Sequence, residues 1–325
     1  MFVQPGFCRI FQKDAERTFD YRDPLKSMNY RKLGRTGLSV SEIGFGALEV
    51  GRDWPLWRGG EPDSVRPAEA EGIYTIHEAI DLGVNFFDTA PAYLESEGLL
   101  GRALEGARRD SVILATKCGE WFDGSASQYN YSYDETEKFI EQSLRQLRTD
   151  RIDLLQIHSG NVDVVRRGET LAAMKKAQTS GKIRFLGISV DAEDAALAAI
   201  EDGGYDCIQL SYNLLSRSME KSVIPKAEER NLGLIVKDGL AAGRLTTKFA
   251  LLSDERQKAQ ISKIAERTER VGLNLAEYAI HFVLGNNAVS TMIVGTKSPA
   301  HLRGNIRSAS DLESRQRVSE IETSQ

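Results

Sequence analysis

Short apolar runs alternate with longer amphipathic stretches along most of this chain. Each run is rich in β-branched or aromatic residues, and a loop and a stretch with helical spacing follow it. The runs predict eight strands, over residues 43–46, 85–88, 112–117, 152–158, 183–190, 207–211, 232–237 and 291–294. Strands that alternate with helices form parallel sheets through right-handed crossovers. The pattern therefore predicts an α/β fold, and closure of eight such units gives a (β/α)8 TIM barrel.

The amphipathic stretches place helices after these strands. We expect helices over residues 67–82, 97–104, 134–147, 169–179, 192–201, 219–229 and 299–308. Asp134 is the expected N-cap of the third helix, because Glu137 follows it at the spacing of a capping box. A charged helix over 254–270 and a more apolar one over 275–284 fall between the seventh and eighth strands. The barrel is therefore expected to carry an extra helix at that point.

The start of the chain departs from this alternation. Residues 1–27 contain scattered aromatic and charged residues with no sustained period. We expect them to be an N-terminal extension that is poorly structured or serves as a packing arm. Residues 29–40 predict a short strand, a glycine-rich turn and a second strand, which is the pattern of a β-hairpin. A single barrel domain is therefore expected over residues 28–325.

Composition narrows the functional classes. The chain has 325 residues, of which 41% are hydrophobic and 27% charged, as in ordinary globular proteins. A net charge of −5 without a long basic block argues against a nucleic-acid partner, and no apolar stretch is long enough for a membrane span. The three cysteines, Cys8, Cys118 and Cys207, are far apart and odd in number, which indicates neither disulfides nor a metal site. We therefore expect a cytoplasmic protein.

Four residues able to move or orient a proton lie at or just beyond the ends of predicted strands. Asp88, Lys117 and His158 end the second, third and fourth strands, and Tyr93 lies in the loop after the second. Because parallel strands end at the same rim of a barrel, these side chains are expected to converge. Such convergence is typical of proton-coupled chemistry.

The four residue types suit the reduction of a carbonyl group. Hydride addition leaves negative charge on oxygen, and a tyrosine phenol can neutralise this charge by donating its proton. The phenol is a weak acid, with a reference pKa near 10, unless a nearby ammonium such as Lys117 stabilises the phenolate. Asp88 would keep that lysine charged and oriented. His158 could donate a hydrogen bond to the carbonyl.

The motifs that carry these residues resemble the aldo-keto reductase superfamily. They are FDTAPAY over 87–93, ATK over 115–117 and QIH over 156–158, supported by RKLGRTGLSVS over 31–41 and GKIR over 181–184. The resemblance runs from about residue 28 to residue 309. It implies a barrel closed at its floor by the N-terminal hairpin. It also implies a catalytic tetrad of Asp88, Tyr93, Lys117 and His158, which reduces aldehydes or ketones with NAD(P)H, or runs the reverse reaction, without a metal.

The resemblance also implies a nicotinamide site, and the match there is partial. Gly46 and Ala47 belong to a segment that lines the nicotinamide pocket in the family, while Ser189 and Gln209 match residues that hold its carboxamide. An asparagine common in the family is replaced by Val190, which removes an amide hydrogen bond worth about 0.5–1.5 kcal/mol.

The segment after the seventh strand departs further from the family pattern. Lys237, Gly239 and Leu240 stand where the family has an aromatic-Ser-Pro-Leu segment. Aromatic packing on the nicotinamide would then come from Tyr212 or be absent. Lys237 could bind the pyrophosphate as a point charge, or be a solvated lysine at the strand end.

Residues near the C-terminus resemble the family's adenosine-phosphate loop. Gly295, Lys297, His301 and Asn305 are the expected contacts, because backbone amides at a helix start and a lysine suit a phosphate. A contact with the 2′-phosphate would favour NADP(H) over NAD(H), and we expect NADP(H). Gly304 stands where a glutamate usually meets the adenine.

The substrate pocket rests on loops. Trp54, Trp57, Trp121 and Phe122 follow the first and third strands and could form an aromatic carbonyl pocket, or pack as lids on their own loops. Arg58 and Glu120 could add polar selection. The expected partner is a small carbonyl or alcohol, and the sequence indicates no oligomeric state.

The sequence leaves two other functions open. The same barrel occurs in accessory subunits of ion channels, so the chain could be a cofactor-binding regulatory or partner subunit with weak turnover. A lysine Schiff-base lyase, with Lys117 as the nucleophile, is the third reading.

Overall fold

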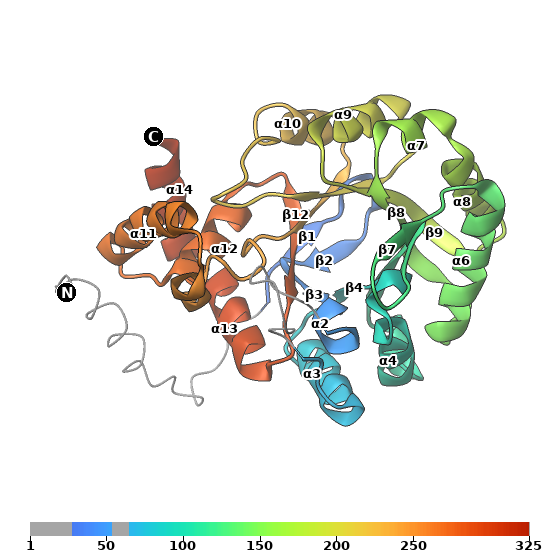
Figure 1. Ribbon diagram of the computed structural model, residues 1–325, viewed down its shortest axis with the longest axis horizontal. Helices are drawn as coiled ribbons and strands as arrows, with labels where there is room; N and C mark the ends of the chain where they lie inside the picture. Colours follow the sequence, from blue (N-terminus) through green and yellow to red (C-terminus); the bar gives the residue numbers. More distant parts are fainter. Residues whose placement is uncertain (1–27, 54–64, 325) are drawn as a thin grey trace.

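A closed barrel of eight parallel strands forms the centre of the molecule (Figure 1). This computed structural model describes residues 28–53 and 65–324. Neighbouring strands pair in the order β10-β11-β12-β3-β4-β5-β8-β9, which confirms the predicted (β/α)8 fold. The barrel strands are β3 (Ile43–Gly46), β4 (Phe86–Asp88), β5 (Ile113–Cys118), β8 (Ile152–Gly160), β9 (Ile183–Val190), β10 (Cys207–Ser211), β11 (Gly233–Lys237) and β12 (Val289–Gly295).

The N-terminal hairpin packs against the inner floor of this barrel. Strands β1 (Tyr30–Lys32) and β2 (Ser39–Ser41) pair antiparallel around the short 3-10 helix η1 (Gly34–Thr36). Leu33 and Val40 are fully buried, in a cluster with side chains from the barrel strands. Gly34 has φ +48°, and a Cβ there would lie 2.2 Å from the backbone nitrogen of Gly233. Only glycine lets the hairpin approach the strand so closely.

Helices surround the barrel (Figure 1). The larger ones are α3 (Glu69–Asp81), α4 (Ser96–Ala103), α6 (Tyr133–Gln146), α8 (Glu169–Thr179), α9 (Glu193–Asp202), α10 (Val223–Glu229), α12 (Leu275–Gly285), α13 (Pro299–Ser310) and α14 (Leu312–Thr323). Shorter segments are α2 (Leu48–Gly51), η2 (Pro91–Tyr93), α5 (Ala107–Asp110), α7 (Val162–Arg167) and η3 (Thr247–Leu251). Within the described residues, no helix has the length and apolar character that a bilayer crossing requires.

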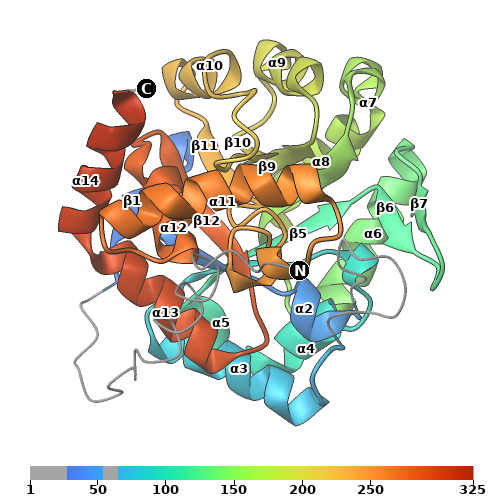
Figure 2. The same ribbon diagram turned by 60° about the vertical axis from the view of Figure 1, so that its left-hand side comes forward.

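The extra helix predicted between the last two strands is α11 (Glu255–Arg270). It follows a loop from β11 and lies across the barrel in Figure 2, in front of the strands. Asp254 caps its N-terminus by accepting hydrogen bonds from the backbone nitrogens of Arg256 and Gln257. Helix α12 then occupies the position of the usual barrel helix before β12.

The segment between β5 and α6 differs from its prediction in two respects. A two-stranded hairpin, β6 (Glu120–Phe122) and β7 (Ser127–Tyr129), lies where only a loop was expected. The N-cap of α6 is Ser132, whose Oγ accepts from the backbone nitrogen of Glu135 at 3.4 Å. The prediction of Asp134 as the cap is therefore wrong. Serine competes equally well for the N-cap position, which lies two residues earlier in the chain than predicted.

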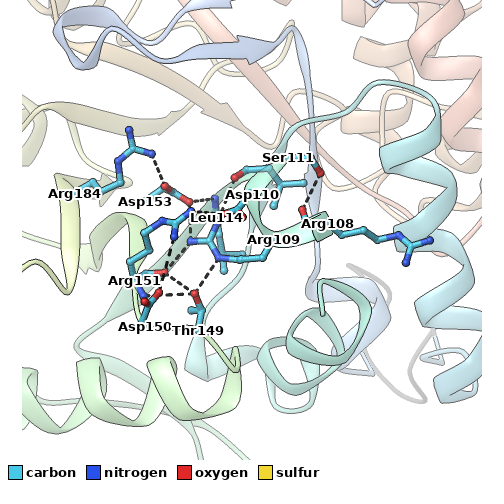
Figure 3. Close-up of polar contacts among 11 residues, drawn as sticks. Arg108, Arg109, Asp110, Ser111, Leu114, Thr149, Asp150, Arg151, Asp153 and Arg184 are labelled. Atoms are coloured by element: carbon cyan, nitrogen blue, oxygen red, sulfur yellow. Dashed lines mark hydrogen bonds and ion pairs between the residues drawn. The ribbon is translucent and has the colours of Figure 1, made fainter. Parts of the chain in front are cut away.

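A buried ionic network joins the starts of the barrel strands β5, β8 and β9 (Figure 3). Asp153, only 1% exposed, accepts from the backbone nitrogen of Leu114 at 3.0 Å and pairs with Arg109 at 2.9 Å and Arg184 at 2.7 Å. Arg109 also donates to the carbonyl of Arg151 at 2.8 Å. One guanidinium thus satisfies a buried carboxylate and a strand-end carbonyl together.

We expect Arg109→Met to lower the free energy of unfolding by about 3 kcal/mol, because a buried carboxylate loses one of its two cations. Urea unfolding followed by circular dichroism measures the change. The matched control is Arg108→Met, since Arg108 is exposed and points away from the network in Figure 3. Equal stability of the two variants would contradict the stabilising role of the network.

Candidate active site

The structure brings the four predicted catalytic side chains together at the carboxyl ends of neighbouring strands. Lys117 Nζ lies 2.5 Å from Asp88 Oδ2 and donates to Tyr93 Oη at 3.3 Å. It also donates to the carbonyl oxygen of Thr89 at 3.0 Å. Three acceptors thus match the three donors of the ammonium. The rings of Tyr93 and His158 meet edge to face, with centroids 5.6 Å apart.

The carboxylate of Asp88 is held on both oxygens. While Oδ2 accepts from Lys117, Oδ1 accepts from the side-chain amides of Gln156 and Gln209, each at 3.0 Å. Asp88 is 4% exposed and Lys117 is 1% exposed. A buried ion pair is stable only when such additional hydrogen bonds satisfy its lone pairs and protons. The pair therefore orients the lysine rigidly toward the phenol.

Burial sets the protonation states of these groups. It raises the pKa of Tyr93 above its usual value, and the nearby Lys117 opposes this shift without cancelling it. Burial acts to lower the pKa of Lys117, but Asp88 and Tyr93 outweigh it and raise that pKa. Near neutral pH the site therefore contains a phenol with a proton to donate and a charged lysine beside it.

The pKa of His158 shifts in the opposite direction. Burial, with the positive charges of Lys117 and Lys237, lowers the pKa of His158 well below its usual value. The imidazole is therefore neutral. Its Nδ1 lies 3.2 Å from Glu120 Oε2, and the side chain lines the same cavity as Asp88 and Tyr93.

A large cavity, of about 2330 Å³, extends from these residues along the barrel mouth to helix α13. It is larger than the roughly 300–1,000 Å³ typical of a pocket for one small molecule. Residues from α11, α12 and the loop after β11 form part of its wall. Of the predicted cofactor contacts, those that line it are Gly46, Gln209, Lys237, Gly239, Leu240, Gly295, His301 and Asn305.

Comparison with known proteins fits this geometry. Residues 42–324 match the model of the Aldo/keto reductase family. The chain belongs to this family. L-galactose dehydrogenase from Arabidopsis thaliana is 31% identical over 319 residues, covering 92% of this chain and 94% of the relative. The NADH-specific methylglyoxal reductase of Escherichia coli is 27% identical over 304 residues, covering 84% and 91%.

A solved structure shares the same architecture. An aldo-keto reductase from Bacillus halodurans superposes with a TM-score of 0.75 at 27% identity, covering 90% of this chain and 96% of that one. Members of the family are oxidoreductases that use nicotinamide cofactors. The large cavity beside the four residues is consistent with room for both a dinucleotide and a substrate.

The residues present fit such a cofactor at the end of the cavity near α13. His301, Gly304 and Asn305 of this helix line the cavity. A Cβ added at Gly304 would meet no atom within 4 Å, so the helix surface is open at that point. Lys237 lies nearer the catalytic groups, where its ammonium contacts Asp191 at 2.6 Å and donates to Ser189 Oγ at 3.2 Å. The positive charge of Lys237 is therefore partly neutralised by the exposed carboxylate of Asp191.

Several predicted contacts lie away from the cavity lining. Tyr212 is 2% exposed, packs on Phe282 and donates to Glu220 at 2.8 Å. We therefore correct the prediction that Tyr212 stacks on a nicotinamide, because its ring packs in the core beside α12. Ala47 and Ser189 are buried without lining the cavity, and Lys297 donates to the carbonyl of Val65 at 2.5 Å.

The predicted aromatic pocket is only partly described. Trp54 and Trp57, with Arg58, lie outside the described residues. Trp121 is 37% exposed and packs near Phe139, with ring centroids 6.2 Å apart. Phe122 stacks under the guanidinium of Arg52, which lies 3.4 Å from its ring centroid. Neither of these two aromatic residues lines the cavity, because Trp121 lies beside α6 and Phe122 beside the end of α2.

Polar side chains, rather than Trp121 and Phe122, line the cavity near the catalytic residues. Arg52, Glu120 and Ser159 line this part of the cavity, and Glu49 lines the wall next to Gly295. The sequence signalled only Glu120. Arg52 and Glu49 belong to the short helix α2 and its end, which was not predicted, so nothing indicated that they would turn toward the barrel axis.

Left-handed backbone follows three of the residues at the site. Leu94 comes directly after Tyr93 with φ 52°, Ser159 after His158 with φ 51°, and Asp238 after Lys237 with φ 56°. Non-glycine residues rarely adopt this conformation, which costs on the order of 1 kcal/mol each. The chain thus turns sharply away just past each functional side chain.

Proposed function

We propose that this protein reduces an aldehyde or ketone to an alcohol with NADP(H), or catalyses the reverse oxidation. The observation that carries the proposal is the contact chain from Asp88 through Lys117 to Tyr93 at the cavity wall. A nicotinamide cofactor bound in the cavity supplies or accepts the hydride. The protein's own residues supply the proton and fix the geometry.

Tyr93 acts in this proposal as the general acid for reduction. Its half-buried phenol keeps its proton until negative charge develops on the substrate oxygen within hydrogen-bonding reach. Proton transfer then leaves a phenolate beside the ammonium of Lys117. An opposite charge at hydrogen-bonding distance lowers the free energy of that phenolate, and Asp88 keeps the ammonium in place. In the oxidation direction the same groups take the proton from the alcohol.

The other two readings lose support. A Schiff-base lyase needs a neutral lysine amine, yet the ammonium of Lys117 has three acceptors and a raised pKa. A purely regulatory subunit would not need an acid and its charge partner arranged at the cavity. Oxidation of NADPH in the presence of a panel of aldehydes, ketones and sugars, followed by absorbance, tests the proposal. The absence of turnover with every compound would refute it.

We infer further that NADP(H) is preferred over NAD(H). The support is the pair of basic residues at α13: His301 lines the cavity from the first turn, and the exposed Lys297 precedes the helix with its ammonium on the carbonyl of Val65. We expect the dissociation constant for NADPH to be about tenfold lower than that for NADH, the effect of one charged hydrogen bond of about 1.5 kcal/mol. Fluorescence titration with both cofactors measures it.

The lysine offers the matched variant for this test. Lys297→Met should raise the dissociation constant for NADPH about tenfold, because it removes one charged hydrogen bond, and leave that for NADH nearly unchanged. If the two cofactors bind equally to the wild-type protein, the preference does not exist. The methylglyoxal reductase from Escherichia coli is NADH-specific by name, so the family alone does not decide the matter.

A further inference from the structure

Glu120 is a buried carboxylate beside the catalytic residues. It opens strand β6, is 7% exposed and lines the cavity. Ser127 Oγ donates to its Oε1 at 2.7 Å, and Ser159 Oγ donates to its Oε2 at 2.8 Å. The two serines come from different strands, Ser127 from β7 and Ser159 from β8. They fix the plane of the carboxylate, so its position is set by the fold.

This carboxylate faces a single nitrogen of His158. Its Oε2 lies 3.2 Å from Nδ1, which is buried and, within the described part of the chain, has no hydrogen-bond partner of good geometry. A small rotation of either side chain would complete the bond. A lone pair on Nδ1 would instead point at a negative oxygen, which is unfavourable in a buried site.

A neutral imidazole has one proton to place. When Nδ1 carries it, Nε2 has a lone pair and can only accept a hydrogen bond. The partner of one ring nitrogen decides the state of the other, as in other carboxylate–imidazole pairs. In this protein the ring lines the cavity while Nδ1 is buried, so Nε2 is the nitrogen left to meet a substrate.

We propose that Glu120 is a positioning residue that holds His158 in the Nδ1–H form, and that the site therefore takes hydroxylated carbonyl compounds. The hydroxyl next to the reacting carbon donates to Nε2, while Tyr93 donates to the carbonyl oxygen. This substrate class rests on the proposed function. It also replaces the expectation that His158 donates to the carbonyl.

The arrangement of the neighbouring groups supports this division of roles. Lys117 and Tyr93 form the donor side, where charge develops on oxygen. The rings of His158 and Tyr93 meet edge to face, with centroids 5.6 Å apart, so the imidazole borders the part of the cavity next to the phenol. Polar groups line this part of the cavity, with Arg52 and Ser159 beside the carboxylate, whereas Trp121 and Phe122 do not. Such a lining suits a substrate with several hydroxyl groups.

The tautomer can be measured without any turnover. The chain has four histidines, so long-range ¹H–¹⁵N correlation spectra of the ¹⁵N-labelled protein are simple, and single substitutions of His77, His281 and His301 assign the fourth. We expect His158 to carry its proton on Nδ1. In Glu120→Ala the spectrum should change to the Nε2–H pattern that prevails in free imidazole side chains. Wild-type His158 with its proton on Nε2, or on both nitrogens, would overturn the proposal.

Two further variants separate this effect from damage to the hairpin. Glu120→Gln keeps the shape and removes the charge, and should reduce the Nδ1–H population even if Glu120→Ala does not fold. Asp123→Asn changes another carboxylate of the same hairpin, at its turn and away from the cavity lining, and should leave the His158 signals unchanged. An unchanged tautomer in Glu120→Gln and Glu120→Ala would exclude Glu120 as its cause.

Turnover tests the substrate class with a pair of aldehydes that differ by one hydroxyl. We expect the ratio of kcat/KM for glycolaldehyde to that for acetaldehyde to fall about tenfold in Glu120→Ala, the loss of one hydrogen bond of about 1.4 kcal/mol. Using the ratio cancels the intrinsic reactivity of each aldehyde. An unchanged ratio with normal turnover overturns the substrate class, whereas loss of turnover with both aldehydes and a panel of other carbonyls refutes the proposed function instead.

Discussion

Tyr93→Phe should lower kcat for carbonyl reduction by about 10²–10⁴-fold, the usual contribution of a general acid. The variant keeps the ring, and with it the edge-to-face contact with His158, and loses only the hydroxyl that Lys117 contacts at 3.3 Å. No other proton donor contacts Lys117 among the described residues, so we expect no substitute acid. Steady-state kinetics with NADPH, together with its dissociation constant, measure the effect.

The matched control is Tyr129→Phe. Tyr129 lies on β7 of the hairpin near the site but is 53% exposed, so its hydroxyl has no part in the proposed chemistry. The control should retain wild-type rates, and both variants should bind NADPH with nearly the wild-type affinity. Substantial reduction by Tyr93→Phe would mean that another group delivers the proton.

Lys117→Met should have two effects at once. The variant leaves the buried carboxylate of Asp88 without its cation, which we expect to lower the free energy of unfolding by about 3 kcal/mol. It also removes the charge that stabilises the phenolate of Tyr93, so kcat should fall by about 10²-fold or more. Urea unfolding and steady-state kinetics measure the two effects separately.

A double variant separates the structural effect from the chemical one. In Asp88→Asn with Lys117→Met, the buried charge is gone, and the asparagine oxygen can still accept from Gln156 and Gln209. Most of the lost stability should return, while kcat stays low because no ammonium faces Tyr93. Recovery of kcat together with stability would show that Lys117 acts only through folding.

The barrel could be predicted because its signals are local and repeated. The strands β3, β9 and β10 have the predicted bounds, since each is a short apolar run between polar residues. Hairpin β6–β7 could not be foreseen, because its strands have only three residues each and pair across a polar turn. Helix α7 is short and is joined directly to α8 by Gly168, so the sequence pattern indicated only one helix after β8.

The site was predictable where a residue lies at a strand end. Asp88, Lys117 and His158 were placed together because strand order fixes where the last few residues of each strand lie, and all three are within three residues of a strand end. Residues in connecting segments were less predictable. Tyr212 follows β10 by one residue, but the direction of its side chain depends on packing against Phe282, 70 positions away in the chain. Such contacts leave no trace in local periodicity.

The residues with left-handed backbone beside the site affect the thermal stability of this enzyme. Glycine in place of Leu94 or Asp238 would relax the main chain there and gain on the order of 1 kcal/mol. The same change would also give more conformational freedom to the backbone that positions Tyr93 or Lys237. Selection for thermal stability alone should therefore favour glycine at these two positions. The selected variants should be more stable but have a lower kcat.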